Sequence, residues 1–341
     1  MSAAADSVRR APVVGRLSSG RLIDLAYRLR AFGILAALAV LIVVTSAIQP
    51  RFLSGNEVNI VLGNTTILAL LSLGEAMVVI TRNVDLSVGS VLGLAAYASG
   101  NIFGHLHGAS TTTAIVLSFL VGIGVGTACG IVNGALVTIG RVPSLVVTLA
   151  TLYIIRGLDI WIIGGGQVVA SSLPNAFFEI SLKSFHNVPY LAIAVAAVVG
   201  VGAYYMRSFR SGRDLYAIGS NPQAARLVGI PTARRVFTAF VVSGALAGVA
   251  GVLWASKYGT LDSTAGTGYE LSVIAAVVIG AALGALLLNT ILAALYVVGV
   301  SPFWTQAISG ALILVAISID RVITLQLTSA LRRRRARAAT A

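Results

Sequence analysis

Apolar runs of about 20 residues recur along this 341-residue chain and limit what it can fold into. Charged residues make up 10% of the sequence and hydrophobic residues 57%, whereas soluble domains carry roughly 25% charged residues. A helical run of this length crosses the ~30 Å hydrocarbon core of a bilayer. The strands of a membrane barrel are short and alternating, and these runs are continuously apolar. The sequence therefore predicts an all-α, polytopic membrane helical bundle.

Apolar windows bounded by charges and helix breakers define the predicted spans. They cover residues 31–49, 58–80, 86–104, 112–139, 145–163, 190–206, 236–258, 271–300 and 303–319. Because six spans precede the basic loop 207–235, this loop lies on the same side as the N-terminus. The positive-inside rule makes that side the cytoplasm. Residues 50–57, 105–107, 164–189 and 259–270 are then expected outside, the last segment holding Asp262 and Glu270.

The run 271–300 fits neither one crossing nor two. A single helix would leave the cluster Arg332–Arg335 outside, against the positive-inside rule. Two crossings need about 40 residues and a turn, and this run has 30 residues. We therefore expect a distorted, half-crossing or re-entrant segment, broken near Gly280–Gly284. The predicted bundle has nine to ten transmembrane segments.

The net charge of +13 arises at three places along the chain. Arginines gather in the leader 1–30, in the loop 207–235 and in the tail 321–341, and all three are expected in the cytoplasm. Between leader and tail lies a transmembrane domain, residues 31–320. Arginines placed in this way orient the chain and contact membrane lipid, so nucleic acid is not an expected partner.

The chain lacks a loop that could bind ATP. Its two lysines are Lys183 in S-L-K-S-F and Lys257 in A-S-K-Y-G, and neither ends the glycine-rich G-K-[ST] loop that cradles phosphates. If ATP drives this protein, a partner subunit binds ATP-Mg and hydrolyses it. The histidines and the single cysteine show no metal-ligand spacing, so no cofactor, metal or catalytic residue is predicted for this chain.

A short rigid helix is predicted within the basic loop. Asn221 can cap it, Pro222 suits its first position, and it runs through Ala225 and Arg226 until Gly229 ends it. Such a helix on the cytoplasmic face is what a membrane subunit would offer to a motor protein. From the residues alone, an ordinary interhelical loop explains it equally well.

Three acidic residues lie in or beside apolar runs. Glu75 is expected to face protein or water, either along a solute pathway or in a helix–helix hydrogen bond for which Arg82 is a candidate partner. Asp85 is interpreted as the N-cap of the next helix. Asp159 follows Arg156 on one helix face and is interpreted as its ion-pair partner.

A faint internal repeat links two of the predicted helices. D-L-S-V begins at Asp85 and E-L-S-V begins at Glu270, and each is followed by an apolar run. The first begins inside and the second outside on the predicted topology, as an inverted repeat requires. Chance matches between apolar segments are common, so both readings stay open.

Four stretches, in order, resemble permeases of bacterial ribose, xylose and related sugar importers driven by ATP-binding cassettes. They are G-E-A-M-V-V-I-T-R-N-V-D-L-S-V-G-S-V from Gly74, N-G-A-L-V-T-I-G-R-V-P-S-L-V-V-T-L-A-T-L-Y-I-I-R-G-L from Asn133, G-R-D-L-Y-A-I-G-S-N-P-Q-A-A-R-L-V-G-I from Gly212, and G-V-S-P-F-W-T-Q from Gly299. The resemblance runs from about Phe52 to Arg321. It departs from the family after Gly280, where a glycine-rich cytoplasmic turn is missing.

The resemblance implies a permease of the bacterial inner membrane that dimerises with a second copy or a homologue. It implies cytoplasmic ATP-binding cassette subunits and an extracytoplasmic sugar-binding protein as partners. The segment Asn221–Gly229 would dock the ATPase as a coupling helix, with Arg213 and Asp214 fixing the loop. Glu75, Asp85 and Asn133 are carried forward as candidate pathway or structural residues.

The predicted function is import of a small sugar, a pentose or a related monosaccharide, by alternating access. A branched-chain amino acid permease of related architecture is one alternative. A membrane-embedded lipid-linked transferase is another, and it would need clustered acids or metal ligands at the membrane face. The eleven acidic residues of this chain are scattered.

Overall fold

A computed structural model describes residues 16–105 and 110–301, together with 304, 307, 308, 310, 311 and 314. Its helices are α1 (Arg16–Ile48), η2 (Pro50–Leu53), α2 (Gly55–Ile80), α3 (Val88–His105), α4 (Thr111–Thr138), α5 (Ser144–Ile163), η3 (Ala170–Ser172), α6 (Asn175–Leu182), α7 (Tyr190–Ser208), α8 (Arg210–Ser220), α9 (Pro222–Leu227), α10 (Thr232–Tyr258), α11 (Tyr269–Ile279) and α12 (Ala282–Val298). A two-stranded hairpin, β1 (Ser184–Phe185) with β2 (Val188–Pro189), is the sheet in this part of the chain. The predicted all-α class is confirmed.

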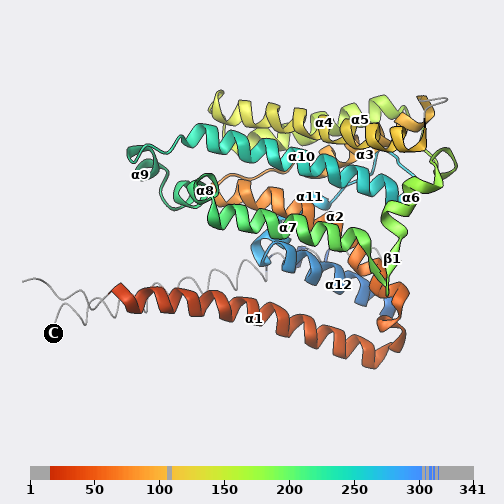
Figure 1. The fold of residues 1–341 in the computed structure, drawn as a ribbon, viewed down its shortest axis with the longest axis horizontal. Coiled ribbons are helices and arrows are strands. Elements are labelled where there is room, and N and C mark those ends of the chain that lie inside the picture. The colour runs from red at the N-terminus through yellow and green to blue at the C-terminus, as the bar shows by residue number, and fades with distance from the viewer. Residues whose placement is uncertain are drawn as a thin grey trace, which may run out of the picture.

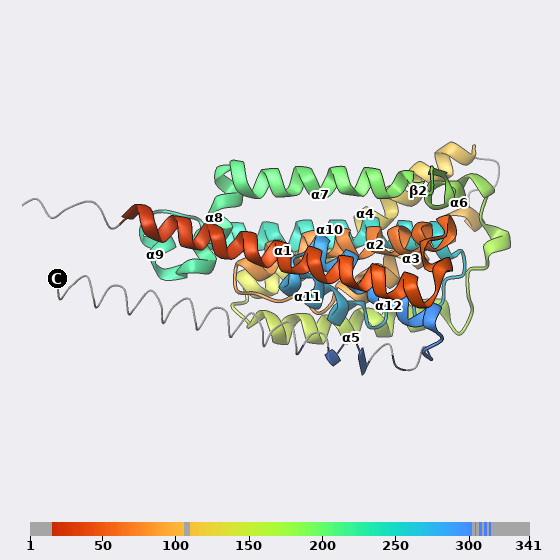
Figure 2. The same ribbon diagram turned by 90° about the horizontal axis from the view of Figure 1, so that it is seen from below.

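The long helices lie side by side and end at two faces (Figures 1 and 2). We call the face with α8 and α9 the loop end, and the opposite face with α6, β1 and β2 the hairpin end. The segments predicted on one side, 81–85, 140–144 and 207–235, gather at the loop end. Those predicted on the other side, 50–57 and 164–189, gather at the hairpin end (Figure 1). The leader up to residue 15, the loop 106–109 and most of the last span and tail lie outside the described residues.

Five helices, α2, α4, α5, α7 and α10, are long and apolar enough to cross a membrane. In the apolar stretch of α2, 78% of the residues are buried, whereas the share in α7 is 11%. α2 is therefore a central helix and α7 a peripheral one. Large apolar side chains on the outer helices, such as Trp161 and Val201, are exposed on the outside of the bundle, as a lipid-facing surface requires.

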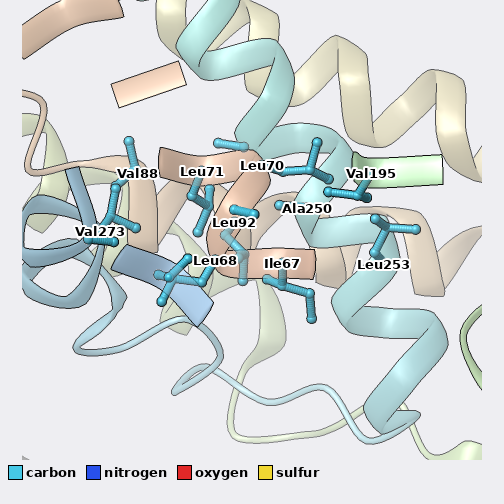
Figure 3. Packing of buried hydrophobic residues seen from close by; sticks show 14 of the residues in the cluster. Ile67, Leu68, Leu70, Leu71, Val88, Leu92, Val195, Ala250, Leu253 and Val273 are labelled. Carbon is cyan, nitrogen blue, oxygen red and sulfur yellow. The ribbon is translucent and has the colours of Figure 1, made fainter. Parts of the chain in front are cut away.

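Glycines bring α4 and α10 into backbone contact. A Cβ atom on Gly126 would lie 2.1 Å from the carbonyl oxygen of Gly244, and one on Gly248 would lie 2.2 Å from that of Gly122. Small residues four positions apart are what close helix packing in membranes uses, because lipid gives apolar side chains no reason to associate. The apolar core around Leu70, between α2, α3 and α10, lies beside this contact (Figure 3).

The run 271–300 is divided where the sequence predicts. α11 ends at Ile279, the chain turns at Gly280 and Ala281, and α12 follows. Ala281 has φ +52° and ψ −110°, a conformation that favours glycine. Only two residues connect α11 to α12, so the chain has to reverse within a very short turn. The 11 residues of α11 reach about 16 Å, which is too short for a crossing.

The chain before α11 supplies the missing length, so the predicted external segment 259–270 is wrong in its second half. Leu261 pairs with Val168 at the hairpin end. Beyond it the chain runs into the bundle beside α3, and Glu270 lies in the first turn of α11. Residues 263–268 make this inward path as a series of hydrogen-bonded turns. After α11, α12 runs back and packs against Phe52.

We predict that Gly126→Ala destabilises the bundle and that Gly124→Ala does not. The first substitution forces α4 and α10 apart, which costs about 1–3 kcal/mol as overpacking. A Cβ atom on Gly124, in the same helix, meets nothing within 4 Å, so the control variant keeps or slightly raises stability. The thermal midpoint of the purified protein in detergent measures both. Equal midpoints for the two variants would contradict the glycine contact.

Candidate functional site

The first turns of α3 and α11 meet inside the bundle. A Cβ atom on Gly89 of α3 would lie 2.6 Å from the carbonyl oxygen of Gly266 and 3.4 Å from the amide nitrogen of Glu270. From this point α3 runs to the hairpin end and α11 toward the loop end, the opposed directions that the Asp85 and Glu270 repeat requires (Figures 1 and 2). The first N–H groups of a helix lack helical partners and carry partial positive charge. These N–H groups therefore need polar side chains inside the bundle as hydrogen-bond partners.

Four polar side chains join at the start of α3. The Asp85 N–H donates to Glu75 Oε1 at 3.0 Å. Asp85 Oδ1 accepts from the N–H and the hydroxyl of Ser87 at 2.9 and 2.6 Å, and Asn133 Nδ2 of α4 donates to Ser87 Oγ at 2.8 Å. None of the four residues is more than 2% exposed. The structure thus brings the three candidates Glu75, Asp85 and Asn133 together and adds Ser87.

Two local predictions about these acids need correction. Glu75 does not bond to Arg82, because the Arg82 side chain donates to the carbonyl oxygens of residues 219 and 220 instead. Asp85 is not the N-cap residue, since α3 begins three residues later, at Val88. Asp85 instead closes the turn before the helix by accepting the Ser87 N–H. A hydrophobic pattern predicts the start of a helix only to within a few residues. The start of α3 is determined by the turn that Asp85 closes.

Two buried acceptors of this network are unpaired. Glu75 Oε2 and Asn133 Oδ1 have no hydrogen-bond partner among the described residues. Buried polar atoms are nearly always paired with protein or with ordered water, and a charged residue at bilayer depth costs about 2.5–3.5 kcal/mol on insertion scales. A proton on the Glu75 carboxyl group and a hydrogen-bond donor beside Asn133 Oδ1 would satisfy these atoms.

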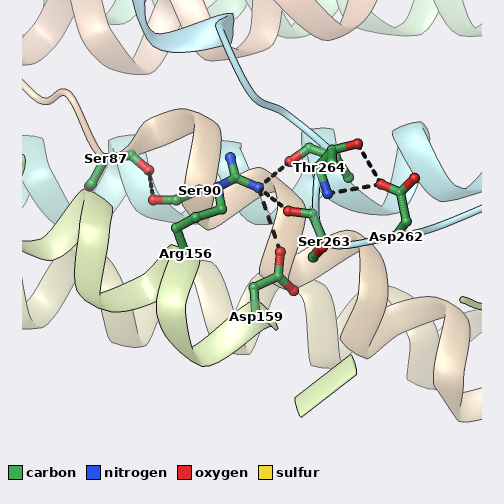
Figure 4. A network of polar contacts seen from close by, with 8 residues as sticks. Ser87, Ser90, Arg156, Asp159, Asp262, Ser263 and Thr264 are labelled. Atoms are coloured by element: carbon green, nitrogen blue, oxygen red, sulfur yellow. Dashed lines mark hydrogen bonds and ion pairs between the residues drawn. The ribbon is translucent and has the colours of Figure 1, made fainter. Parts of the chain in front are cut away.

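Arg156 of α5 holds the series of turns that precedes α11 (Figure 4). Its Nη1 donates to the carbonyl oxygens of Ser263 and Ala265 at 2.9 and 2.8 Å. The same atom lies 3.6 Å from Asp159 Oδ2, which confirms the predicted ion pair. Asp159 is fully buried and its oxygens have no hydrogen bond among the described residues. Arg156 therefore balances this carboxylate and satisfies bare backbone at the same time.

Asp262 closes the first turn of this segment, at its outer end. Its Oδ1 accepts from the Thr264 N–H at 2.8 Å and from the Thr264 hydroxyl at 2.6 Å. These bonds, the hydroxyl bond first, lower the pKa of the Asp262 carboxyl. The turn is therefore stabilised above the ordinary pKa of an aspartate, and this contribution disappears as the pH falls through the lowered pKa.

α9 forms as the sequence predicts. Asn221 Oδ1 accepts from the backbone N–H groups of residues 223 and 224 at 3.0 and 3.1 Å. Pro222 is the first helical residue, and Gly229, just beyond the helix, has φ +82°. The cap, the proline and the glycine are local signals, so no tertiary contact was needed to find this helix.

Ion pairs and hydrogen bonds anchor α8 to its neighbours. Asp214 Oδ2 accepts from Arg235 Nε at 2.8 Å, which joins α8 to the first turn of α10. Arg213 Nη1 donates to the carbonyl oxygen of Ser208 at 2.6 Å, which joins α8 to the end of α7. The loop 207–235 is thus tied at both ends to long helices.

α9 is held more lightly and presents an apolar tip. Ala225 is buried, and Arg226 Nε donates to Thr232 Oγ1 at 3.2 Å. Leu227 and Val228, at its end, are 88% and 73% exposed. Two neighbouring large apolar side chains are thus exposed beside the arginines of the loop 207–235.

A tight joint connects α8 to the network at the start of α3. Arg82 donates from Nε and Nη2 to the carbonyl oxygens of Gly219 and Ser220 at 2.5 and 2.8 Å. A Cβ atom on Gly219 would lie 1.9 Å from the carbonyl oxygen of Ile80. Displacement of α8 must therefore move the end of α2 and the turn containing Asp85. This role of Arg82 could not be predicted from the sequence, because its partners are more than 130 residues away.

The described part of the chain holds no group of three or more His, Cys, Asp or Glu side chains placed to bind a metal ion. The long apolar helices of this bundle define an integral membrane protein. The chain belongs to the family described as the branched-chain amino acid transport system / permease component, whose model matches residues 58–317.

Curated relatives cover most of the chain. The autoinducer 2 import system permease protein LsrC of Enterobacter sp. (strain 638) is 34% identical over 300 residues, which covers 84% of each chain. The ribose import permease protein RbsC of Escherichia coli (strain K12) is 32% identical over 302 residues, covering 84% of this chain and 92% of the relative. A probable ABC transporter permease protein, y4mJ of Sinorhizobium fredii, is 34% identical over 310 residues, covering 87% and 90%. No solved structure matches the chain.

We predict that Arg156→Met destabilises the protein strongly and that Asp159→Asn in the same chain recovers part of the loss. The single variant leaves a buried carboxylate without its cation, at a cost of about 3–5 kcal/mol. The double variant removes that charge but leaves the carbonyls of residues 263 and 265 without a donor, so it stays below the wild type. The thermal midpoints of the wild type, the two single variants and the double variant are compared as a double-mutant cycle. Additive losses would contradict the coupling.

Proposed function

We propose that this chain is the membrane-spanning permease subunit of an ATP-binding cassette importer for a small, uncharged sugar. The observation that carries the proposal is the similarity over most of the chain to a ribose import permease and to autoinducer 2 import permeases. The rigid loop 207–235 supports the coupling part of the proposal, and the substrate rests on the relatives.

ATP hydrolysis belongs, in this proposal, to separate cytoplasmic subunits. Neither lysine of the chain lies in a phosphate-binding loop, so this chain binds no ATP-Mg of its own. The loop end faces the cytoplasm, since Arg207, Arg210, Arg213, Arg226, Arg234 and Arg235 all belong to it. The hairpin end then faces the binding protein that delivers the sugar, and the N-terminus is cytoplasmic.

The coupling segment is Asn221–Gly229, and its exposed tip docks the ATPase. Closure of the ATPase subunits moves α9 and α8, and the Arg82 joint passes this movement to the end of α2. The Asp214–Arg235 ion pair passes it to α10. The polar network of Glu75, Asp85 and Asn133 lies directly beyond the joint, so the same movement alternately opens and closes a polar pathway. A second permease copy or a homologue completes the path at a dimer interface within the lipid bilayer.

A branched-chain amino acid importer is the second candidate, favoured by the description of the matching family. The test is uptake by proteoliposomes that hold the permease with the ATPase and the binding protein encoded beside it. We expect ATP-dependent accumulation of labelled ribose or xylose and none of labelled leucine. Leucine uptake without sugar uptake would replace the first candidate by the second. If the purified chain catalysed transfer of a lipid-linked group without any ATPase partner, both importer candidates would be overturned.

We predict that Leu227→Asp or Val228→Asp weakens binding of the ATPase subunit by at least about tenfold, because a charge replaces an apolar contact at the centre of the interface. Sugar uptake falls with it. Leu182→Asp is the control, since Leu182 is 60% exposed but lies in α6 at the hairpin end. Pull-down of the ATPase by the purified permease measures the effect. Full binding by Leu227→Asp would remove α9 from the coupling interface.

A further inference from the structure

A cluster of aromatic and polar side chains lies between α2, α10 and α11, toward the hairpin end. The ring of Trp254 lies 4.4 Å from that of Tyr258 and 5.1 Å from that of Tyr269, between ring centroids. Tyr258 is 42% exposed, and Trp254 and Tyr269 are half-buried. The cluster can therefore be reached from outside, while its inner side is enclosed by helices.

Lys257 brings a positive charge to this cluster without a carboxylate partner among the described residues. Its Nζ donates to Asn64 Oδ1 of α2 and lies 5.6 Å from the centroid of the Tyr258 ring. The Tyr258 hydroxyl donates to the same Asn64 oxygen at 3.0 Å. A Cβ atom on Gly63 would lie 2.8 Å from Lys257 Nζ, so the glycine makes room for the ammonium group.

The hydrogen-bonding capacity of these side chains is only partly used. An ammonium group has three donors, and one of them is taken by Asn64 in the described part of the chain. The other lysine of the chain, Lys183, differs in this respect, because it is exposed and pairs with Glu179 at 2.8 Å. That contact raises the pKa of Lys183 through its hydrogen bond and charge. Among the described residues, Lys257 instead keeps two donors without a partner at a partly buried position.

A small cavity continues inward from the cluster. It has a volume of about 60 Å³ and is lined by Tyr269, Ser272 and Asn289 among apolar side chains of α2, α11 and α12. Tyr269 belongs both to the aromatic cluster and to the cavity wall. Leu68, another lining residue, lies one helical turn beyond Asn64 on α2. Tyr269 and this turn of α2 therefore place the cavity next to the cluster.

We propose that Asn64, Trp254, Lys257, Tyr258 and Tyr269 form a recognition site for an uncharged sugar as it enters the permease. Aromatic ring faces are electron-rich and suit the C–H face of a sugar ring. The unused ammonium and amide donors suit its hydroxyl oxygens. Ligand sites in proteins combine this apolar surface with a few convergent polar groups. The inference rests on the proposed function and assigns this chain a part in sugar selection.

Binding to the permease alone tests the site. In a variant with Trp161→Phe and Trp304→Phe, Trp254 is the remaining tryptophan, and both replaced residues are exposed. Ribose and xylose are titrated against this protein in lipid nanodiscs while the tryptophan fluorescence is recorded. We expect a saturable change whose dissociation constant rises at least about tenfold in Lys257→Met. Lys257→Arg keeps a donor and retains part of the affinity, and Lys183→Met leaves it unchanged.

Three outcomes of the titration would overturn the site. They are the absence of a saturable change with any pentose or hexose, equal affinity in the wild type and Lys257→Met, and binding of ribose 5-phosphate in place of ribose. Lys257 could otherwise serve only to stabilise the last turn of α10 through the helix dipole. In that event Lys257→Met lowers the thermal midpoint and leaves the sugar affinity unchanged. The thermal midpoint is therefore measured for each variant.

Transport separates failure of the site from failure of the proposed function. In proteoliposomes with the ATPase and the binding protein, Lys257→Met is expected to raise the KM for sugar uptake while the ATPase subunit binds as tightly as before. Wild-type sugar uptake with an unchanged KM in Lys257→Met would refute the site and leave the importer standing. Uptake of leucine alone by the wild type would refute the importer and, with it, the sugar site.

Discussion

Backbone groups inside a bilayer must find their hydrogen-bond partners within the protein, and the rest of this fold depends on that constraint. The chain leaves regular helix inside the bundle in two places, between α2 and α3 and before α11. Glu75 and Asp85 accept from backbone N–H groups at the first place, and Arg156 donates to backbone carbonyls at the second. Polar side chains are needed there because lipid offers backbone groups no hydrogen-bond partner. The interior of the bundle is therefore polar at the points where its helices are interrupted.

The two helix breaks are surrounded by closely packed helices. Glycines of α3, α4 and α10 allow backbones to touch, so the irregular segments are enclosed by protein and kept away from lipid. The enclosed polar network lies beside the joint between Arg82 and the end of α8. A movement of α8 at the loop end would therefore be transmitted to the polar network and could change its hydrogen bonds. The aromatic cluster around Lys257 lies farther along, toward the hairpin end.

Sequence reasoning succeeded where the signal is local. The cap at Asn221, the break at Gly280 and the Arg156–Asp159 pair each depend on residues within one or two turns. The partners of Arg82 could not be predicted, because they lie far away in the chain. The path of residues 262–268 could not be predicted either, because no sequence period distinguishes turns that enter a bundle from an external loop. The roles of Arg213, Asp214, Glu75 and Asn133 in transport stay predictions.

The sequence by itself determined that this chain is a helical membrane protein, because apolar runs and scarce charge allow no other solution in water or in lipid. It also determined where short helices begin and end, since capping acts over a few residues. Only the tertiary structure decided that α3 and α11 start face to face and that Arg156 serves backbone carbonyls. It alone placed Lys257 beside an aromatic cluster. Such contacts join residues far apart in the chain, and a pattern along one helix carries no information about the atoms it will meet.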